Sequence, residues 1–130
     1  MAHVVFVDNG TAEIFDEFEK QGYVVVRSPD ESTVPDESPF ARSTRLLMSR
    51  AKRLKERLDK HKTKFPVIVD STDQTVIARQ KFLTEIERNT LETLAPYISR
   101  LDWYDTSTIR LEDTSATEAL HQVLRLSAPI

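Results

Sequence analysis

The sequence contains no cysteine, only two glycines and no long apolar run. The absence of cysteine excludes disulfide frameworks, thiolate zinc sites and thiol nucleophiles. No stretch approaches the roughly 20 apolar residues that a membrane-spanning helix requires, and no basic segment followed by an apolar one opens the chain as in a signal peptide. We therefore expect a cytoplasmic protein that contacts no membrane.

The composition is that of one globular domain. Of the 130 residues, 39% are hydrophobic and 30% are charged, which allows a core without a disulfide or a structural metal. The net charge of −3 is unevenly distributed, because Asp and Glu concentrate in residues 8–37 and Lys and Arg in residues 42–64. Such a division is typical of a polyanion-binding face, or of two oppositely charged helices that neutralise each other.

Strand-like and helix-like patterns alternate along the chain. Short runs rich in β-branched or aromatic residues predict strands at 3–7, 23–26, 65–69, 101–104 and 108–111. Helical spacing predicts helices at 11–21, 40–61, 74–88 and 90–99, and a last one from Ser115. A loop rich in proline at 28–39 is predicted to be mobile. This order predicts a single α/β domain over residues 1–130, a three-layer Rossmann-like (flavodoxin/receiver-like) sandwich with a mostly parallel sheet of about five strands.

Acidic side chains follow two of the predicted strands. Asp8 comes after the first strand, and Asp70 and Asp73 come after the third. If these two strands are neighbours, the carboxylates converge at the carboxyl edge of the sheet, where open α/β sheets bind ligands. Carboxylate oxygens suit Mg²⁺, so one hypothesis is a magnesium-dependent phosphoryl-transfer or phosphodiester enzyme that uses these three residues. The competing interpretation is that they are turn and cap residues, since such turns need Asp in any case.

The N-terminal third resembles a response-regulator receiver domain. The resemblance lies in Val4-Val5-Phe6-Val7-Asp8-Asn9, the helix that follows it, and Gly22-Tyr23-Val24-Val25-Val26. It implies that Asp70 takes the phosphoacceptor position. Receivers usually carry two acids where this chain has only Asp8, and Ile109-Arg110-Leu111-Glu112 supplies no lysine after the last strand. The resemblance therefore implies a pseudo-receiver, which binds partners and is not phosphorylated.

A second resemblance is to small P-loop nucleotide kinases. Phe65–Val69, the following Asp70-Ser71-Thr72 and a helix containing Arg79 are similar to the middle of such kinases. The phosphate loop is missing, because the first turn reads Asp8-Asn9-Gly10-Thr11-Ala12 and contains no Gly-Lys-Ser/Thr. Kinase chemistry is therefore not expected.

Two candidate binding surfaces lie elsewhere in the chain. Basic side chains of the helix over 42–64 would contact phosphates of a nucleic acid, or would form a solvated charged face; we single out Arg50, Arg53, Arg57 and Lys60. Trp103 and Tyr104 would form either the edge of the core or a contact patch for a partner.

The leading hypothesis is a non-catalytic, receiver-like regulatory module that recognises a macromolecular partner. We expect that partner to be another protein or a second copy of the chain in a homodimer. The magnesium enzyme and the nucleic-acid binder remain the alternatives.

Overall fold

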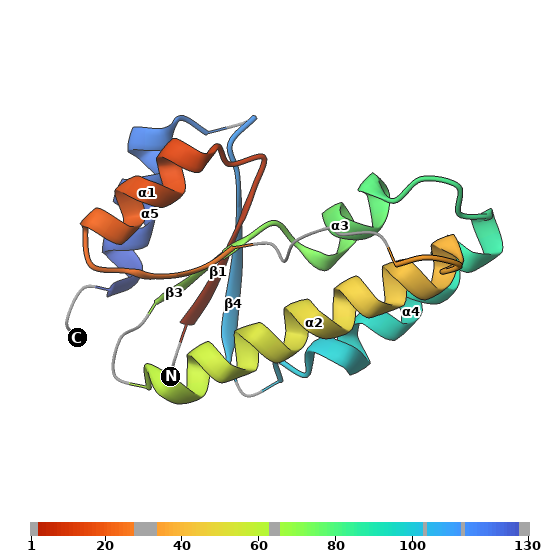
Figure 1. The fold of residues 1–130 in the computed structure, drawn as a ribbon. Helices are drawn as coiled ribbons and strands as arrows, with labels where there is room; N and C mark the ends of the chain where they lie inside the picture. Colours follow the sequence, from red (N-terminus) through yellow and green to blue (C-terminus); the bar gives the residue numbers. More distant parts are fainter. Residues whose placement is uncertain (1–2, 28–33, 63–65, 103, 113, 128–130) are drawn as a thin grey trace.

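The computed structural model describes residues 3–27, 34–62, 66–102, 104–112 and 114–127 (Figure 1). In chain order the elements are β1 (His3–Asp8), α1 (Ala12–Lys20), β2 (Val24–Val26), α2 (Pro39–Lys60), β3 (Val67–Asp70), α3 (Asp73–Arg79), α4 (Glu85–Ser99), β4 (Asp105–Arg110) and α5 (Ala116–Ser127). Part of the predicted loop 28–39 lies outside the described residues. Its end is irregular, and Ser38 caps α2 by accepting a hydrogen bond from the amide of Ala41 at 3.1 Å.

The four strands form one parallel sheet in the order β2-β3-β1-β4. β1 pairs with β3 so that Val4 lies opposite Val67 and Val7 lies opposite Asp70. The prediction that these two strands are parallel neighbours is confirmed. Because they run in the same direction, the residues that follow each of them share one edge of the sheet.

The α/β, Rossmann-like fold class is confirmed, with four strands where about five were predicted. The predicted strands at 101–104 and 108–111 are replaced by the single strand β4. The amide of Tyr104 donates to the carbonyl of Leu101 at 3.0 Å, which closes a turn before β4 begins. Leu101 and Tyr104 are apolar because they pack against the core from this turn and not from a strand.

The strand order also differs in detail from that of flavodoxin-like sheets. There the first strand lies between the second and the third, whereas here β3 lies between β2 and β1. The connections after β1 and β3 lead to opposite faces of the sheet (Figure 1). The junction between these two strands is therefore the topological switch point, where such sheets bind ligands.

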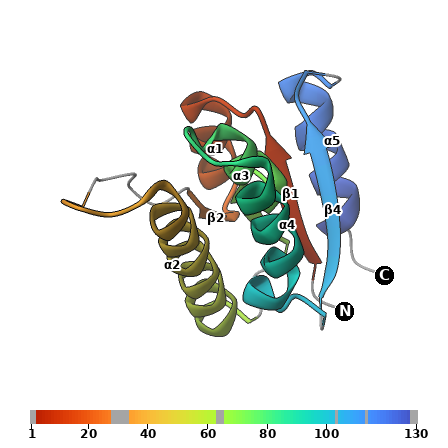
Figure 2. The same ribbon diagram turned by 90° about the vertical axis from the view of Figure 1, so that its right-hand side faces the viewer.

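Helices cover both faces of the sheet because side chains of a strand alternate between its faces. Val5 and Val7 point to the face covered by α1 and α5, where they join a core that includes Phe15 and Phe18. Val4 points to the opposite face and packs with side chains of α2. Figure 2 shows β4 at one edge of the sheet, beside β1.

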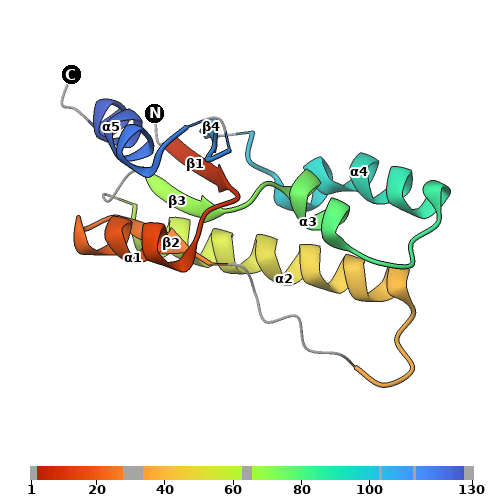
Figure 3. The same ribbon diagram turned by 90° about the horizontal axis from the view of Figure 1, so that it is seen from above.

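A third core cluster lies outside the sheet. α2 continues beyond the strands and packs on α3 and α4, as Figure 3 shows. Leu47, Ile77, Leu91 and Ala95 are buried between the three helices. This helical extension holds one side of the junction that follows β3.

The helices over 73–99 divide at a different place from the one predicted. α3 ends at Arg79 and α4 begins at Glu85, so the break falls at 80–84 and not near residue 89. Phe82 in this break has φ 64°, which a helix cannot contain. Pro96 neither breaks nor ends α4, and it is exposed on the surface of the helix. No helix within the ranges described above is both long and apolar enough to cross a lipid bilayer.

A capping box fixes the start of α4. Thr84 Oγ1 accepts from the amide of Glu87 at 3.1 Å, and Glu87 Oε1 accepts from the amide of Thr84 at 3.0 Å. We expect Thr84→Ala to lower the free energy of unfolding by about 1 kcal/mol, because the amide of Glu87 loses the hydroxyl that accepts its hydrogen bond. Thr93→Ala, in the exposed middle of the same helix, is the matched control and should change it by less than about 0.5 kcal/mol. Urea unfolding followed by circular dichroism measures both values, and equal losses would contradict the capping role.

Candidate functional site

The candidate site is the junction between β3 and α3, at the carboxyl edge of the sheet. Ser71 follows β3 with φ 68° and is fully buried. Its amide donates to the carbonyl of Val7 at 3.0 Å, so the chain stays attached to β1 past the end of β3. A positive φ is uncommon for serine and needs support from the surrounding structure.

Asp8 supplies part of that support. Its side chain ends β1 and only 2% of the residue is exposed. The carboxylate accepts from the amide of Thr72 at 2.8 Å and lies 3.3 Å from the Thr72 hydroxyl. Asp8 therefore clamps the turn after β3 onto the end of β1, which is a structural use of the carboxylate.

Arg50 also supports the backbone of Ser71, from the side of the junction that faces α2. It projects from α2, is only 3% exposed, and donates to the carbonyl of Ser71. Its Nη1 lies 3.3 Å from Asp73 Oδ1, and its guanidinium carbon lies 5.9 Å from the centre of the Phe6 ring, a cation–π distance. α2 is thereby tied to the sheet and to the start of α3.

The charge of Arg50 is compensated by three carboxylates. Burial lowers the pKa of Arg50 below its ordinary value, and the negative charges of Asp73, Asp70 and Asp8 oppose that shift, Asp73 most strongly. A guanidinium stays charged even after a large downward shift, so Arg50 is a cation at neutral pH. The three acids proposed as a magnesium site therefore surround a cation that the chain itself provides.

Asp73 extends this network to a third helix. Its Oδ2 accepts from the hydroxyl of Ser99 at 2.6 Å, while Oδ1 faces Arg50. On the other side of the junction, Ser71 Oγ donates to Asp70 Oδ1 at 3.0 Å and accepts from Arg79 at 3.2 Å. Asp8, Asp70 and Asp73 thus all have partners from within the fold.

These partners bear on whether the junction can bind a metal ion. In the ranges that the structure describes, no group of three or more His, Cys, Asp and Glu side chains is arranged to hold a metal ion. The sequence predicted that the three acids gather at one edge, but it missed the buried arginine among them. Mg²⁺ binding stays a prediction, and the observed geometry does not favour it.

A polar cleft of about 510 Å³ opens beside the junction. Its lining comes from the start of α3 and its N-cap, the end of β4, the segment that follows β4, and α5: Thr72, Gln74, Thr108, Ile109, Arg110, Thr114 and Gln122. Among these described residues Arg110 carries the one charge, and it lies 3.9 Å from Glu112. The cleft holds hydroxyl and amide groups without an acid–base pair, so this lining offers hydrogen bonds and no evident catalytic group.

The predicted binding residues do not form one surface. Arg53, Arg57 and Lys60 are exposed on α2, whereas the burial of Arg50 removes it from any contact with a phosphate backbone. Tyr104 is half-buried against the core. Trp103 lies outside the described residues.

Two surface features were missed in the sequence. Ile86 and Tyr97 on α4 are 78% and 74% exposed, and Phe82 is 87% exposed. The exposure of Ile86 and Tyr97 could have been predicted from the sequence, since both fall outside the helical stripe of Leu91, Ala95 and Ile98. The second feature is a basic cavity beside Phe82, which only the fold assembles.

Comparison with known proteins gives no match to a family model, to a curated protein or to a solved structure. Function is therefore inferred from the geometry of the chain itself.

Replacing Arg50 tests its role in the junction. We expect Arg50→Met to lower the free energy of unfolding by about 3–5 kcal/mol at pH 7, because it leaves the buried Asp8 and the half-buried Asp73 without their cation. Arg53→Met, on the exposed side of α2, is the control. Urea unfolding at pH 7 makes the measurement, and a loss for Arg50→Met no larger than that for Arg53→Met would contradict the role.

Proposed function

We propose that the chain is a non-catalytic binding module that associates with a second copy of itself through the outer face of α4. This outer face consists of Ile86, Thr90, Thr93, Leu94 and Tyr97. Ile86 and Tyr97 are eleven residues apart, which is about three helical turns, so they lie on the same side of the helix. Large apolar side chains exposed together in this way are typical of a protein interaction site.

The two threonines make the outer face less polar than its sequence indicates. Thr90 Oγ1 donates to the carbonyl of Ile86 at 2.8 Å, and Thr93 Oγ1 donates to the carbonyl of Asn89 at 3.0 Å. Because these hydroxyls are bonded back to the helix, they place no competing demand on a partner. The outer face between Ile86 and Tyr97 can therefore be covered without leaving a hydroxyl unsatisfied.

The absence of charge on this face favours a second copy as the partner. Symmetric dimers bring the same surface patch of both subunits together, so any charged group near the axis meets its own like charge. The five residues of the outer face carry no charge, and a two-fold contact between them has no such repulsion. The same property argues against a nucleic acid at this face, since phosphate binding needs Lys or Arg.

The non-catalytic part of the proposal is supported by the junction after β3. Its acids are engaged with Arg50, Thr72, Ser71 and Ser99, and these contacts favour a structural role for them over one as base, nucleophile or metal ligand. The receiver-like interpretation does not form part of the proposal, because the strand order places β3 where flavodoxin-like sheets have β1. Nucleic-acid binding through Arg53, Arg57 and Lys60 stays a prediction.

Self-association provides the test of the outer face. Sedimentation velocity over a range of concentrations should show a monomer–dimer equilibrium for the wild type and a monomer for Ile86→Glu, because the new charge would be buried at the interface. Leu124→Glu on α5, where the side chain is 51% exposed, makes the same change on the other face of the sheet and should dimerise normally. A monomeric wild type at every concentration would contradict the proposal.

Magnesium provides a separate test of the catalytic alternative. We expect millimolar MgCl2 to leave the Tm of the wild type unchanged relative to NaCl of equal ionic strength, because the acids already have partners within the fold. A ligand that binds only the folded state raises the Tm. A rise specific to Mg²⁺ that disappears in Asp70→Asn would therefore favour the enzyme hypothesis instead.

A further inference from the structure

A second cavity lies at the far end of the helical extension, between the start of α2 and the break that precedes α4. Its volume is about 330 Å³, at the lower end of the range of small-molecule sites. Its lining consists of Val34, Glu37, Pro39, Arg42, Arg79, Gln80, Lys81 and Phe82. We call it the Phe82 cavity.

Positive charge dominates the Phe82 cavity. Arg42, Arg79 and Lys81 come from three different segments, whereas Glu37 is the single acid of the described lining. The Arg45 guanidinium engages both oxygens of Glu37, at 2.8 and 2.9 Å, and this bond holds the pKa of Glu37 below its ordinary value. Because Arg45, which does not line the cavity, compensates the charge of Glu37, the cavity presents a net excess of positive charge to a ligand.

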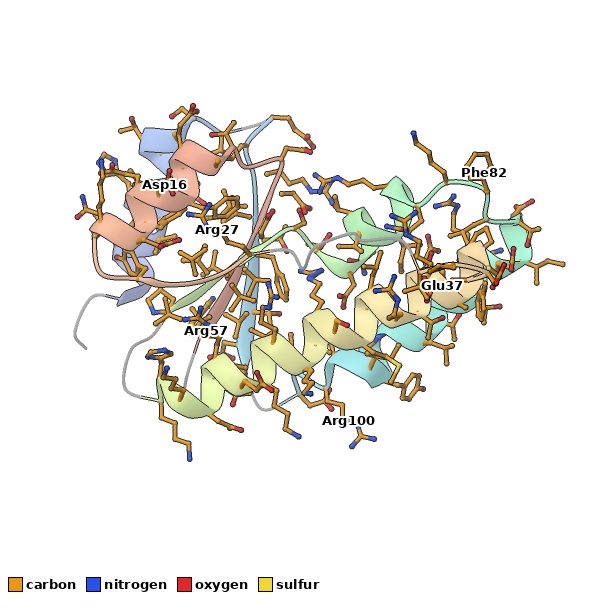
Figure 4. The ribbon with its side chains drawn as sticks, in the orientation of Figure 1. Asp16, Arg27, Glu37, Arg57, Phe82 and Arg100 are labelled. Atoms are coloured by element: carbon orange, nitrogen blue, oxygen red, sulfur yellow. The ribbon has the colours of Figure 1, made fainter. Side chains whose placement is uncertain are left out.

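Phe82 adds an aromatic surface to these cations. Its side chain is 87% exposed at a backbone φ of 64°, a conformation that is a genuine outlier for a bulky residue. Figure 4 shows it pointing away from the helices. Folding thus keeps a large apolar ring in water on a strained backbone, and such outliers cluster at ligand sites.

The segment that carries Phe82 is held at both ends. Arg88 donates to the carbonyls of Ile77 at 2.6 Å and Gln80 at 3.1 Å. The Gln80 side chain donates to the carbonyl of Val76 at 3.1 Å, and the capping box at Thr84 fixes the other end. The ring is therefore presented by an ordered segment, which lowers the entropy lost on binding.

We propose that the Phe82 cavity binds a nucleotide unit, with its phosphate against Arg42, Arg79 and Lys81 and its base stacked on Phe82. Guanidinium and ammonium groups are the usual partners of phosphate, and every nucleobase has a flat face that stacks on an exposed aromatic ring. The Phe82 cavity thus offers a partner to both the phosphate and the base of a nucleotide. The unit comes either from a free nucleotide or from a single-stranded nucleic acid, and this site is independent of the outer face of α4.

Binding experiments with defined probes test the proposal. Isothermal titration calorimetry with adenosine 5′-monophosphate and with a short single-stranded oligodeoxynucleotide should show saturable binding of at least one probe, and the tighter probe identifies the source. Inorganic phosphate and adenosine alone should each bind more weakly. Affinity should fall with added salt, because the phosphate contacts are electrostatic.

Two variants with matched controls assign the binding to the cavity. Phe82→Ala should weaken binding of the favoured probe about tenfold through lost stacking, whereas Leu124→Ala, at an exposed apolar residue of α5 outside the cavity, should not. Lys81→Ala should weaken it several-fold, whereas Arg57→Ala should not, since Arg57 lies roughly 22 Å along α2 from Arg42. All four sites are exposed, so the variants should fold, and circular dichroism checks that they do.

Any one of the following kinds of result would overturn the proposal. The first is no saturation with either probe up to roughly 10 mM. The second is inorganic phosphate that binds as tightly as the nucleotide, or Phe82→Ala that binds as well as the wild type. The third is loss of oligonucleotide binding in Arg57→Ala but not in Lys81→Ala, which would move the site to the other end of α2. None of these results depends on whether the chain dimerises.

Discussion

A buried guanidinium holds this fold together at the place where an open α/β sheet usually does its chemistry. Arg50 lies 3% exposed beneath the turn after β3, bonded to the carbonyl of Ser71 and facing Asp73. An uncompensated charge in such a place is strongly unfavourable, and the carboxylates at the ends of β1 and β3 offset it. The position of α2, the strained backbone of Ser71 and the start of α3 all depend on this arrangement.

The same interaction decides what the edge of the sheet is available for. Carboxylates that converge at a switch point resemble a metal site in sequence, but here they have Arg50 and hydrogen-bond donors of the fold as partners. Function is then expected at surfaces that the core does not use. The outer face of α4 and the Phe82 cavity are two such surfaces, one uncharged and one basic, and both belong to the helical extension beyond the sheet.

Much of the sheet could be predicted from the sequence because its central strands are buried on both faces. Val4, Val5 and Val7 form a short apolar run that is typical of such a strand. β4 was harder to predict, because Asp105-Thr106-Ser107-Thr108 shows no alternation of apolar and polar residues. It is an edge strand, and its side chains are mostly exposed. The break around Phe82 was not predictable from periodicity, because the helical pattern continues through it and only the backbone conformation interrupts it.

The position of Arg50 in the helical pattern of α2 is compatible with burial. It falls three residues after Leu47 and four before Leu54, on the stripe of α2 that faces the core. The neighbouring Ala51 fits the apolar stripe equally well. Only the fold, which places acidic side chains opposite this part of α2, distinguishes Arg50 from Ala51 as the buried residue. The identity of a buried charge's partners is a long-range property, which arises only when residues 50, 70 and 73 are brought together.

A double-mutant cycle between Arg50 and Asp73 tests the central claim most directly. The free energies of unfolding of the wild type, Arg50→Met, Asp73→Asn and the double variant give the coupling between the two side chains. The buried ion pair predicts a coupling of about 1–3 kcal/mol at neutral pH. Additive losses, with a coupling below about 0.3 kcal/mol, would contradict the account.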